Sequence, residues 1–176
     1  MLNISYSASY DPYHTAFRFL ELLRSGACET IDYDWLKIAD FYLCFPQRLS
    51  EFRAPRNISG LKKRINGLVK VLPDVHYAAL PDSNVIFDRM SVVQDTALST
   101  LSKQEIVTLS LLGNRRYISL QEAKIPQPLV EVLQAAADNQ EELLKILSDD
   151  FLQIKILGPG GLKDRSGLGE FRYDTV

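Results

Sequence analysis

The sequence between Asp34 and Pro46 constrains the fold more than any other feature of the chain. It reads Trp-Leu-Lys-Ile-Ala-Asp-Phe-Tyr-Leu-Cys-Phe, so a helix over these residues is apolar on almost every side. Such a helix lies at the centre of a fold, because every side must be covered. Asp32 and Asp34 suit its amino end and Pro46 its carboxyl end. The sequence therefore predicts a central helix over residues 34–45.

Asp40 is the one carboxylate within this apolar run. A buried carboxylate needs a partner such as an arginine or backbone amides, because an unpaired charge is costly away from water. Two interpretations are open: a catalytic group, or an internal polar brace. The brace is favoured, since no histidine or second carboxylate stands beside Asp40 in a recognisable catalytic pattern.

Other segments repeat their apolar residues at helical spacing. One begins at Asp11-Pro12, where aspartate can cap free amides and proline suits the first helical position, and it stops at Gly26. Asn57 is a potential cap for another. The predicted helices cover about residues 12–25, 58–72, 84–101 and 128–147, and the last can break at 138–140.

The period changes at Val107, where apolar residues begin to alternate with threonine and serine as in a half-buried strand. Gly113-Asn114 is a two-residue hairpin turn, and a return strand begins at Arg115. Two helices followed by a hairpin predict a winged-helix-like unit at about residues 57–120, an order that many small domains share. The predicted fold class is mainly α (α+β), with a single, mostly helical domain over residues 1–157.

Residues 158–176 form a glycine-rich tail that holds five of the nine glycines. Charged, leucine and aromatic residues are interleaved with these glycines, whereas an unstructured terminus is usually bland and polar. Glycine adopts backbone conformations that other residues rarely reach, so the tail is expected to have a defined backbone conformation. It is either an ordered docking segment, on this protein or on a partner, or else a flexible tail or the closing strand of the domain.

Composition excludes several classes of function. The 176 residues carry 20 basic and 22 acidic side chains, so no overall field draws the chain to DNA or anionic lipid. Two cysteines make neither a disulfide framework nor a zinc site. A secretory signal pattern is absent, and no apolar run approaches the ~20 residues of a membrane span. We expect a cytoplasmic protein that does not bind membranes.

Catalytic signatures are also absent. The chain has no phosphate-binding loop of the G-x-x-x-x-G-K-[ST] type, no G-x-S-x-G and no H-E-x-x-H. The Gly158-Pro-Gly-Gly-Leu-Lys163 stretch imitates a phosphate loop, but its spacing is wrong. We therefore expect a binding or assembly protein, not an enzyme, with no catalytic residues, no metal site and no cofactor.

Three stretches carry a family resemblance. The tail sequence Gly-Pro-Gly-Gly-Leu-Lys-Asp-Arg-Ser-Gly-Leu-Gly-Glu-Phe-Arg-Tyr-Asp resembles the C-terminal signature of the middle components of bacterial ABC-three-component systems. Asp11-Pro-Tyr-His-Thr-Ala-Phe-Arg-Phe-Leu, leading to Leu36–Pro46, and Phe87-Asp-Arg-Met90 also resemble the family. These proteins look akin to the small accessory subunit of Lamassu-type anti-phage defence complexes.

The resemblance implies a non-catalytic accessory subunit of anti-phage and anti-plasmid defence. Its implied partners are an SMC- or Rad50-like ATPase and an effector that is often a nuclease, which it would bridge. The family's winged-helix character fits the helix-helix-hairpin order. Charged tail residues would bind a partner or lock onto Asp40 of the same chain. The tail match implies these partner-binding positions: Gly160, Gly161, Leu162, Lys163, Asp164, Arg165, Gly167, Leu168, Glu170, Tyr173 and Asp174.

The alternative is a stand-alone winged-helix DNA-binding regulator. One dense basic cluster, with two arginines beside the hairpin turn, would then contact phosphates, whereas the plain interpretation of the cluster is a solvated helix face. In the accessory-subunit hypothesis DNA is met through the complex, and direct contact by this chain stays open. The candidate nucleic-acid residues are Arg53, Arg56, Lys62, Lys63, Arg64, Arg115 and Arg116.

Overall fold

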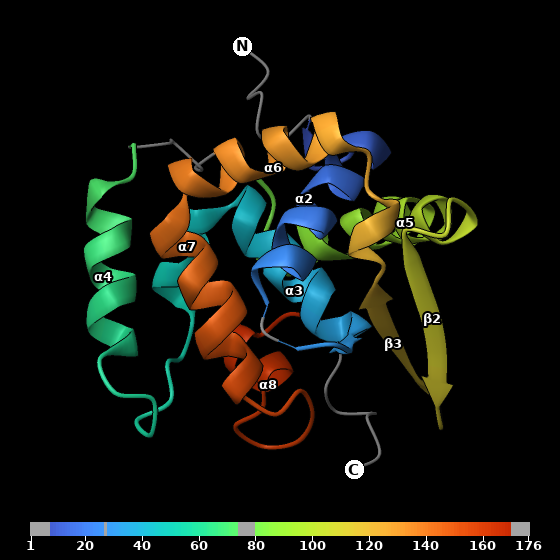
Figure 1. Ribbon diagram of the computed structural model, residues 1–176. Helices are drawn as coiled ribbons and strands as arrows, with labels where there is room; N and C mark the ends of the chain where they lie inside the picture. The colour runs from blue at the N-terminus through green and yellow to red at the C-terminus, as the bar shows by residue number, and fades with distance from the viewer. Residues whose placement is uncertain (1–7, 27, 74–79, 170–176) are drawn as a thin grey trace.

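The computed structural model describes residues 8–26, 28–73 and 80–169 of the chain. Within these ranges the protein is mainly helical with one small sheet, as predicted (Figure 1). The helices and strands are α2 (Pro12–Ser25), β1 (Ile31–Asp32), α3 (Tyr33–Cys44), η1 (Pro46–Glu51), α4 (Leu61–Val71), α5 (Ser83–Lys103), β2 (Val107–Leu112), β3 (Arg115–Leu120), η3 (Glu122–Lys124), α6 (Gln127–Asn139), α7 (Glu141–Lys145), η4 (Ile146–Asp150), η5 (Phe151–Gln153) and α8 (Leu162–Ser166).

Helix α3 is the central helix that its apolar sequence predicts. It packs against α2, α5, β3 and η1, and nearly all of its side chains are buried. The side chain of Asp32 caps its start by accepting a hydrogen bond from the amide of Asp34 at 2.8 Å. Pro46 follows its end, so the chain turns into the 3₁₀ helix η1. The helix predicted over residues 34–45 is confirmed.

A buried polar cluster ties α3 to its two neighbours, α2 and α5. The Arg18 guanidinium donates from Nε to Asp40 Oδ1 at 2.6 Å and from Nη2 to Oδ2 at 3.3 Å. The side-chain amide of Gln94 donates to the same Oδ2 at 2.8 Å. Asp40 is fully buried, and its partners come from α2 and α5. Burial alone would lower the pKa of Arg18, but the Asp40 carboxylate outweighs it and raises that pKa. The brace expected at Asp40 is therefore present.

The ends of α2 also follow the sequence prediction. The Asp11 side chain accepts hydrogen bonds from the amides of Tyr13 and His14 at 2.8 and 2.9 Å. Pro12 occupies the first helical position, and the amide of Gly26 donates to the Leu22 carbonyl at 3.1 Å where the helix stops.

The predicted hairpin is present, and a third strand joins it. β2 and β3 pair in antiparallel fashion around Gly113-Asn114, and Gly113 has a φ of 63°, as the tight turn requires. β1 pairs with β3 through Ile31 and Ile118, which gives the strand order β1-β3-β2. The sequence did not reveal β1, because two residues show no alternation.

Helix α4 differs from prediction in its start and in its neighbours. It begins at Leu61 after Gly60, whose φ of 72° ends the preceding turn, so the expected start at Ile58 with Asn57 as its cap is wrong. It packs on η1 and η4, while α5 packs on α2 and α3. Figure 1 shows α4 and the hairpin at opposite sides of the molecule. A winged-helix unit over residues 57–120 is not confirmed.

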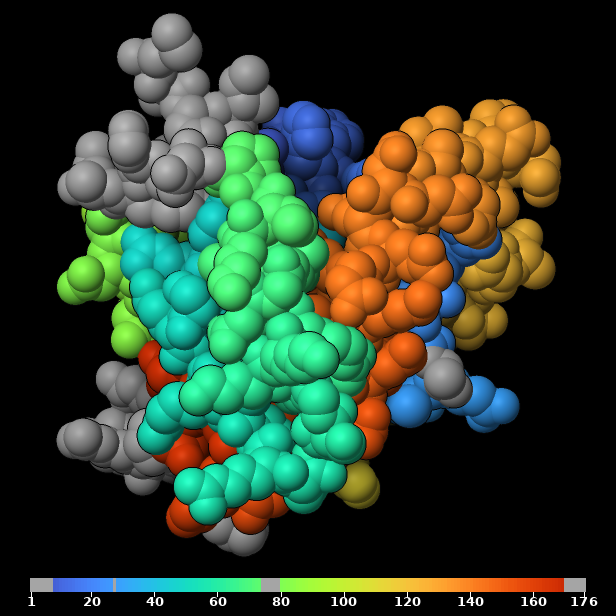
Figure 2. All heavy atoms as spheres, turned by 90° about the vertical axis from the view of Figure 1, so that its left-hand side faces the viewer, coloured from blue at the N-terminus to red at the C-terminus, as the bar shows by residue number. Residues whose placement is uncertain are grey.

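The long C-terminal helix breaks where the sequence predicts a break. Helix α6 ends at Asn139, Gln140 joins it to α7, and a π-helical turn, η4, follows. The Gln140 side chain donates to Glu21 Oε1 at 2.8 Å, so the break is fastened to α2. From the side, α4 lies across the face of the molecule next to α7 and η4 (Figure 2).

We predict that Arg18→Met destabilises the protein by about 3–5 kcal/mol, because it leaves Asp40 as a buried charge without its main partner. Arg24→Met is the matched control. Arg24 is on the same helix but pairs with Glu122, which is 55% exposed, so its loss should cost at most about 1 kcal/mol. Urea unfolding measures both changes. Equal costs for the two variants would contradict the brace.

Candidate docking site at the C-terminal segment

The C-terminal segment, residues 158–169, folds back on the chain that leads to it. The amides of Leu162 and Lys163 donate to the carbonyls of Lys155 and Ile156 at 2.7 and 3.2 Å. Gly160 has a φ of 73°, a left-handed conformation that glycine adopts without strain. The segment is therefore an ordered loop with a short helix, α8, and it docks on its own chain.

Two of its features fix the position of the segment. A methyl group on Gly161 would lie 2.6 Å from the Leu157 carbonyl oxygen and 2.8 Å from that of Ile156, so the turn has no room for a side chain. Leu162 and Leu168 are buried at 0% and 1% exposure. Burying a leucine side chain contributes about 1.5–3 kcal/mol relative to leaving it exposed. These leucines anchor the segment to the core.

Reciprocal hydrogen bonds join Arg53 to the segment. The Arg53 amide donates to the Arg165 carbonyl at 3.1 Å, and Arg165 Nη1 donates back to the Arg53 carbonyl at 2.8 Å. Arg53 Nη2 bonds the Asp164 carboxylate at 2.8 Å and also its carbonyl oxygen. The other oxygen of Asp164 accepts from the amide of Gly160 at 2.8 Å. Both arginines, one predicted for nucleic acid and one for a partner, thus bond within the chain.

Lys163 fastens the segment to the start of α3. Its ammonium lies 2.9 Å from Asp34 Oδ2, and Lys37 approaches the other carboxylate oxygen at 3.0 Å. Burial alone would raise the pKa of Asp34, but the two lysines outweigh burial and hold that pKa below its usual value. Asp34 stays ionised through neutral pH, so this contact is present under ordinary conditions.

The expectation that the tail would lock onto Asp40 is wrong for Lys163 and Arg165. Asp40 is occupied by Arg18 and Gln94, and the two tail cations bond Asp34 and backbone carbonyls instead. Three other positions predicted for partner binding lie outside the described residues; they are Glu170, Tyr173 and Asp174.

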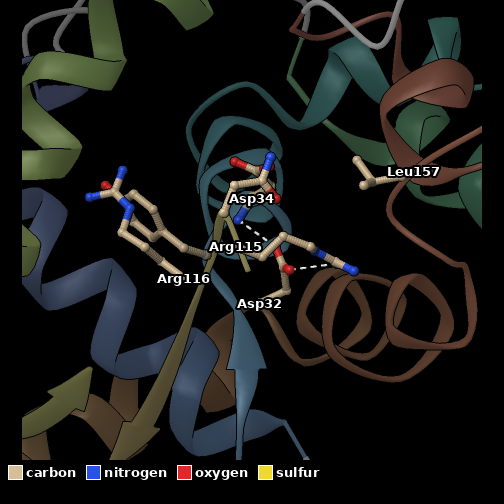
Figure 3. Close-up of a pocket in the computed structure, with 7 residues that line it drawn as sticks. Asp32, Asp34, Arg115, Arg116 and Leu157 are labelled. Carbon is tan, nitrogen blue, oxygen red and sulfur yellow. Dashed lines mark hydrogen bonds and ion pairs between the residues drawn. The ribbon is translucent and has the colours of Figure 1, made fainter. Parts of the chain in front are cut away.

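A small polar cavity lies beside the segment, between β3 and the start of α3 (Figure 3). Its volume is about 150 Å³. Asp32 lines it from the end of β1, Asp34 from the first turn of α3, Arg115 and Arg116 from β3, and Leu157 from the chain entering the segment. Arg115 lies 2.5 Å from Asp32 Oδ2, so the hairpin and the capping residue of α3 are joined across it.

The second arginine of this cavity is held between two helices. Arg116 lies over the ring of Tyr33 at 4.4 Å and 3.2 Å from Asp95 Oδ1 on α5. The Tyr33 hydroxyl donates to the same Asp95 oxygen at 2.9 Å. Burial raises the pKa of Tyr33, and the Asp95 carboxylate raises it further. The charged groups that line the cavity are thus already paired with opposite charges of the same chain. Such a cavity suits a ligand or partner group that is recognised by its shape and by hydrogen bonds.

A second, larger hollow of about 460 Å³ lies on the other side of the segment. Arg53 and Arg165 line it together with Arg48 of η1 and the first residues of α5, including Ser83. Arg48 pairs with Glu51 at 2.9 Å, and Ser83 Oγ bonds the other Glu51 oxygen at 3.2 Å. The docked segment therefore forms part of the wall of this larger hollow, whereas the smaller cavity is lined by Leu157, the residue before the segment.

The candidate nucleic-acid residues divide into two groups. Four have a carboxylate partner within the chain: Arg53, Arg64, Arg115 and Arg116. Arg64 bonds Asp150, which is 4% exposed, at 2.7 Å, so it joins α4 to η4. Arg56, Lys62 and Lys63 are exposed and form no ion pair with any residue of the described ranges.

Sequence reasoning missed Asp34 and the structural role of Arg53. Asp34 was read only as a residue suited to a helix start, and Arg53 only as part of a basic cluster. No local signal marks either one as a partner of the tail, because more than 100 residues separate them from it. Among the described residues, no cluster of three or more histidine, cysteine or carboxylate side chains could hold a metal ion.

Fold and site together define a small, mainly helical protein whose glycine-rich C-terminal segment is docked on the central helix α3 and on Arg53. No helix within the described ranges is long and apolar enough to cross a membrane. The chain belongs to the family described as ABC-three component (ABC-3C) system Middle Component 5, whose model matches residues 4–174. No curated protein and no solved structure matches it.

Gly161→Ala should destabilise the protein by about 1–3 kcal/mol, because the new methyl group clashes with the backbone carbonyl oxygens of Ile156 and Leu157, and the former accepts a hydrogen bond from the Lys163 amide. Gly67→Ala is the matched control, since nothing lies within 4 Å of the added carbon and alanine favours the helix interior. It should be neutral or stabilise by up to about 1 kcal/mol. Thermal or urea unfolding compares the two. A Gly161 variant as stable as the control contradicts the docked turn.

Proposed function

We propose that this protein is a non-catalytic accessory subunit that bridges an SMC- or Rad50-like ATPase and an effector, often a nuclease, in bacterial anti-phage and anti-plasmid defence. The observation that carries the proposal is the Middle Component 5 match over residues 4–174. A middle component of a three-component system works with other subunits, so a surface built for assembly is expected. The role would be akin to that of the small accessory subunit of Lamassu-type complexes.

The docked segment supports this role as the surface on which a partner assembles. Its charged side chains are already fixed, with Lys163 on Asp34 and Arg165 on the Arg53 carbonyl. A partner that binds a fixed surface loses less conformational entropy than one that must order a loose tail. Arg53 keeps 63% of its side chain exposed, so its guanidinium remains accessible beside the bonded Asp164. The segment, 158–169, is the proposed docking unit.

The accessory function predicts that Lys163→Ala/Arg165→Ala lowers the yield of the complex with the other two components. The central α2–α3–α5 cluster does not include these residues, so the isolated variant should keep its helical circular dichroism. Lys124→Ala/Lys145→Ala is the control, because these lysines are 56% and 52% exposed and pair with exposed carboxylates elsewhere. Co-purification measures the outcome. Wild-type yield from the tail variant would remove the segment from the interface.

A DNA-binding role has one specific observation in its favour. Arg56, Lys62, Lys63 and Lys70 are exposed on α4 and the turn before it. Helix α4 lies on the side of the molecule that Figure 2 shows. Exposed cations near one another can replace the counterions of a phosphate backbone. This surface supports contact with DNA in the assembled complex, or by a stand-alone regulator. The salt dependence of binding separates the two functions, since phosphate contacts weaken steeply with salt and an apolar subunit interface does not.

If α4 contacts DNA, Lys62→Ala/Lys63→Ala should reduce the slope of log affinity against log salt by about 2, roughly 1 for each lost phosphate contact. Lys103→Ala/Lys124→Ala provides a control with the same loss of exposed charge elsewhere. Arg64 stays unchanged in both proteins, because its removal would also release the buried Asp150. Fluorescence anisotropy with duplex DNA at several salt concentrations gives the slopes. An unchanged slope excludes the α4 surface.

A further inference from the structure

In the part of the chain that the structure describes, one edge of β2 has no neighbouring strand, and this strand exposes apolar side chains. With the strand order β1-β3-β2, β2 lies at an edge, and it forms the outer side of the hairpin in Figure 1. Its sequence is Val-Thr-Leu-Ser-Leu-Leu, and every residue after Val107 is exposed. Leu109, Leu111 and Leu112 expose 45%, 74% and 72% of their surface.

This edge lacks the usual protection against strand pairing. Natural edge strands carry lysine, proline or a bulge, because an unprotected row of amides and carbonyls is a template for another strand. Within Val107–Leu112 there is no charge and no proline, and the pairing with β3 runs without interruption from Val107–Leu120 to Leu112–Arg115. An uncharged apolar edge that stays exposed is therefore a feature to explain.

The charges around this edge oppose a nucleic-acid ligand. Arg115 and Arg116 on β3 are each paired with a carboxylate, Asp32 and Asp95. The exposed charges of α5 are Asp88 and Asp95 against Arg89 and Lys103, so the helix has no positive excess. In helix-turn-helix proteins the recognition helix enters the groove of DNA, which demands positive charge or polar donors. Here the exposed side chains are instead the leucines of β2 and Val92 of α5, which is 72% exposed. The arginines of β3 are neutralised by the carboxylates that they pair with.

We infer that the free edge of β2 accepts an extended apolar segment of a partner component, which adds as a fourth strand to the sheet. This inference rests on the proposed accessory function. Backbone hydrogen bonds to β2 supply affinity, and alternate apolar side chains of the partner contact Leu109 and Leu111 on one face and Leu112 on the other. At its Asn114 end the hairpin reaches a cavity that is also lined by Leu157, the residue before the C-terminal segment, so a partner on β2 can extend toward that segment.

A second copy of the chain fits this edge less well than a partner component does. Six residues of strand extend over only about 20 Å, and pairing two such edges buries far less than the roughly 1,200 Å² of a stable interface. The same edge suffices as one part of a larger contact that also includes the docked segment. The three-component family supplies such a partner.

The test uses the complete complex and the variant Leu111→Glu/Leu112→Glu. Both side chains are already exposed and lie opposite arginines on β3, so the isolated chain keeps its fold. We expect the affinity for the partner components to fall at least about tenfold, because two charged side chains would replace the apolar ones that the partner strand contacts and would lose water on binding. Val71→Glu/Val132→Glu is the matched control, with exposed valines on α4 and α6 at 79% and 56%.

Hydrogen exchange of the wild-type complex is a second measurement, and it does not depend on the charge that the variant introduces. Strand addition slows the exchange of alternate amides within 107–112 in the wild-type complex relative to the isolated chain. Unchanged affinity of the β2 variant, with wild-type assembly intact, overturns this inference and leaves the accessory function standing. Failure of the wild-type chain to assemble overturns both. Protection of β2 by duplex DNA, or by the chain alone at high concentration, assigns another occupant and overturns the inference.

Discussion

The buried contact between Arg18, Asp40 and Gln94 is the interaction on which the other parts depend. It joins three helices through side chains that are buried in the core, and it fixes the orientation of α3 relative to α2 and α5. With α3 oriented, its amino end presents Asp32 to the hairpin and Asp34 to the C-terminal segment. One charge pair at the centre of the fold thereby sets the position of both surfaces proposed to meet partners.

The C-terminal segment is as much a part of the fold as a helix of the core. Leu162 and Leu168 fill the interior, Gly161 permits close backbone approach, and Arg53 and Arg165 bond each other's backbones. The proposed bridging role would benefit from such rigidity, because a fixed shape transmits the position of one partner to the other. The turn of the hairpin and Leu157, the residue before the segment, line the same cavity.

Local patterns in the sequence predicted the elements that local chemistry determines. Helix α3 followed from an apolar surface on all sides, α2 from Asp11-Pro12, and the hairpin from Gly113-Asn114. Long-range partners could not be predicted, because periodicity and capping carry no information about which distant residue lies opposite. Hence the need of Asp40 for a partner was foreseen while Arg18 was not, and the order in the tail was foreseen as one alternative while its bond to Asp34 was not. β1 and the neighbours of α4 depend on tertiary packing alone.

The most direct test of this account is the hydrogen exchange of the C-terminal segment in the isolated chain. The amides of Leu162, Lys163, Arg165 and Gly167 all donate to backbone carbonyls, and Leu162 is fully buried. The account predicts that these amides exchange slowly, with an opening free energy close to the free energy of global unfolding. The buried amides of α3 should behave in the same way. Exchange at the rate of an unstructured peptide would show that the segment is loose, and would contradict a docking surface built before any partner arrives.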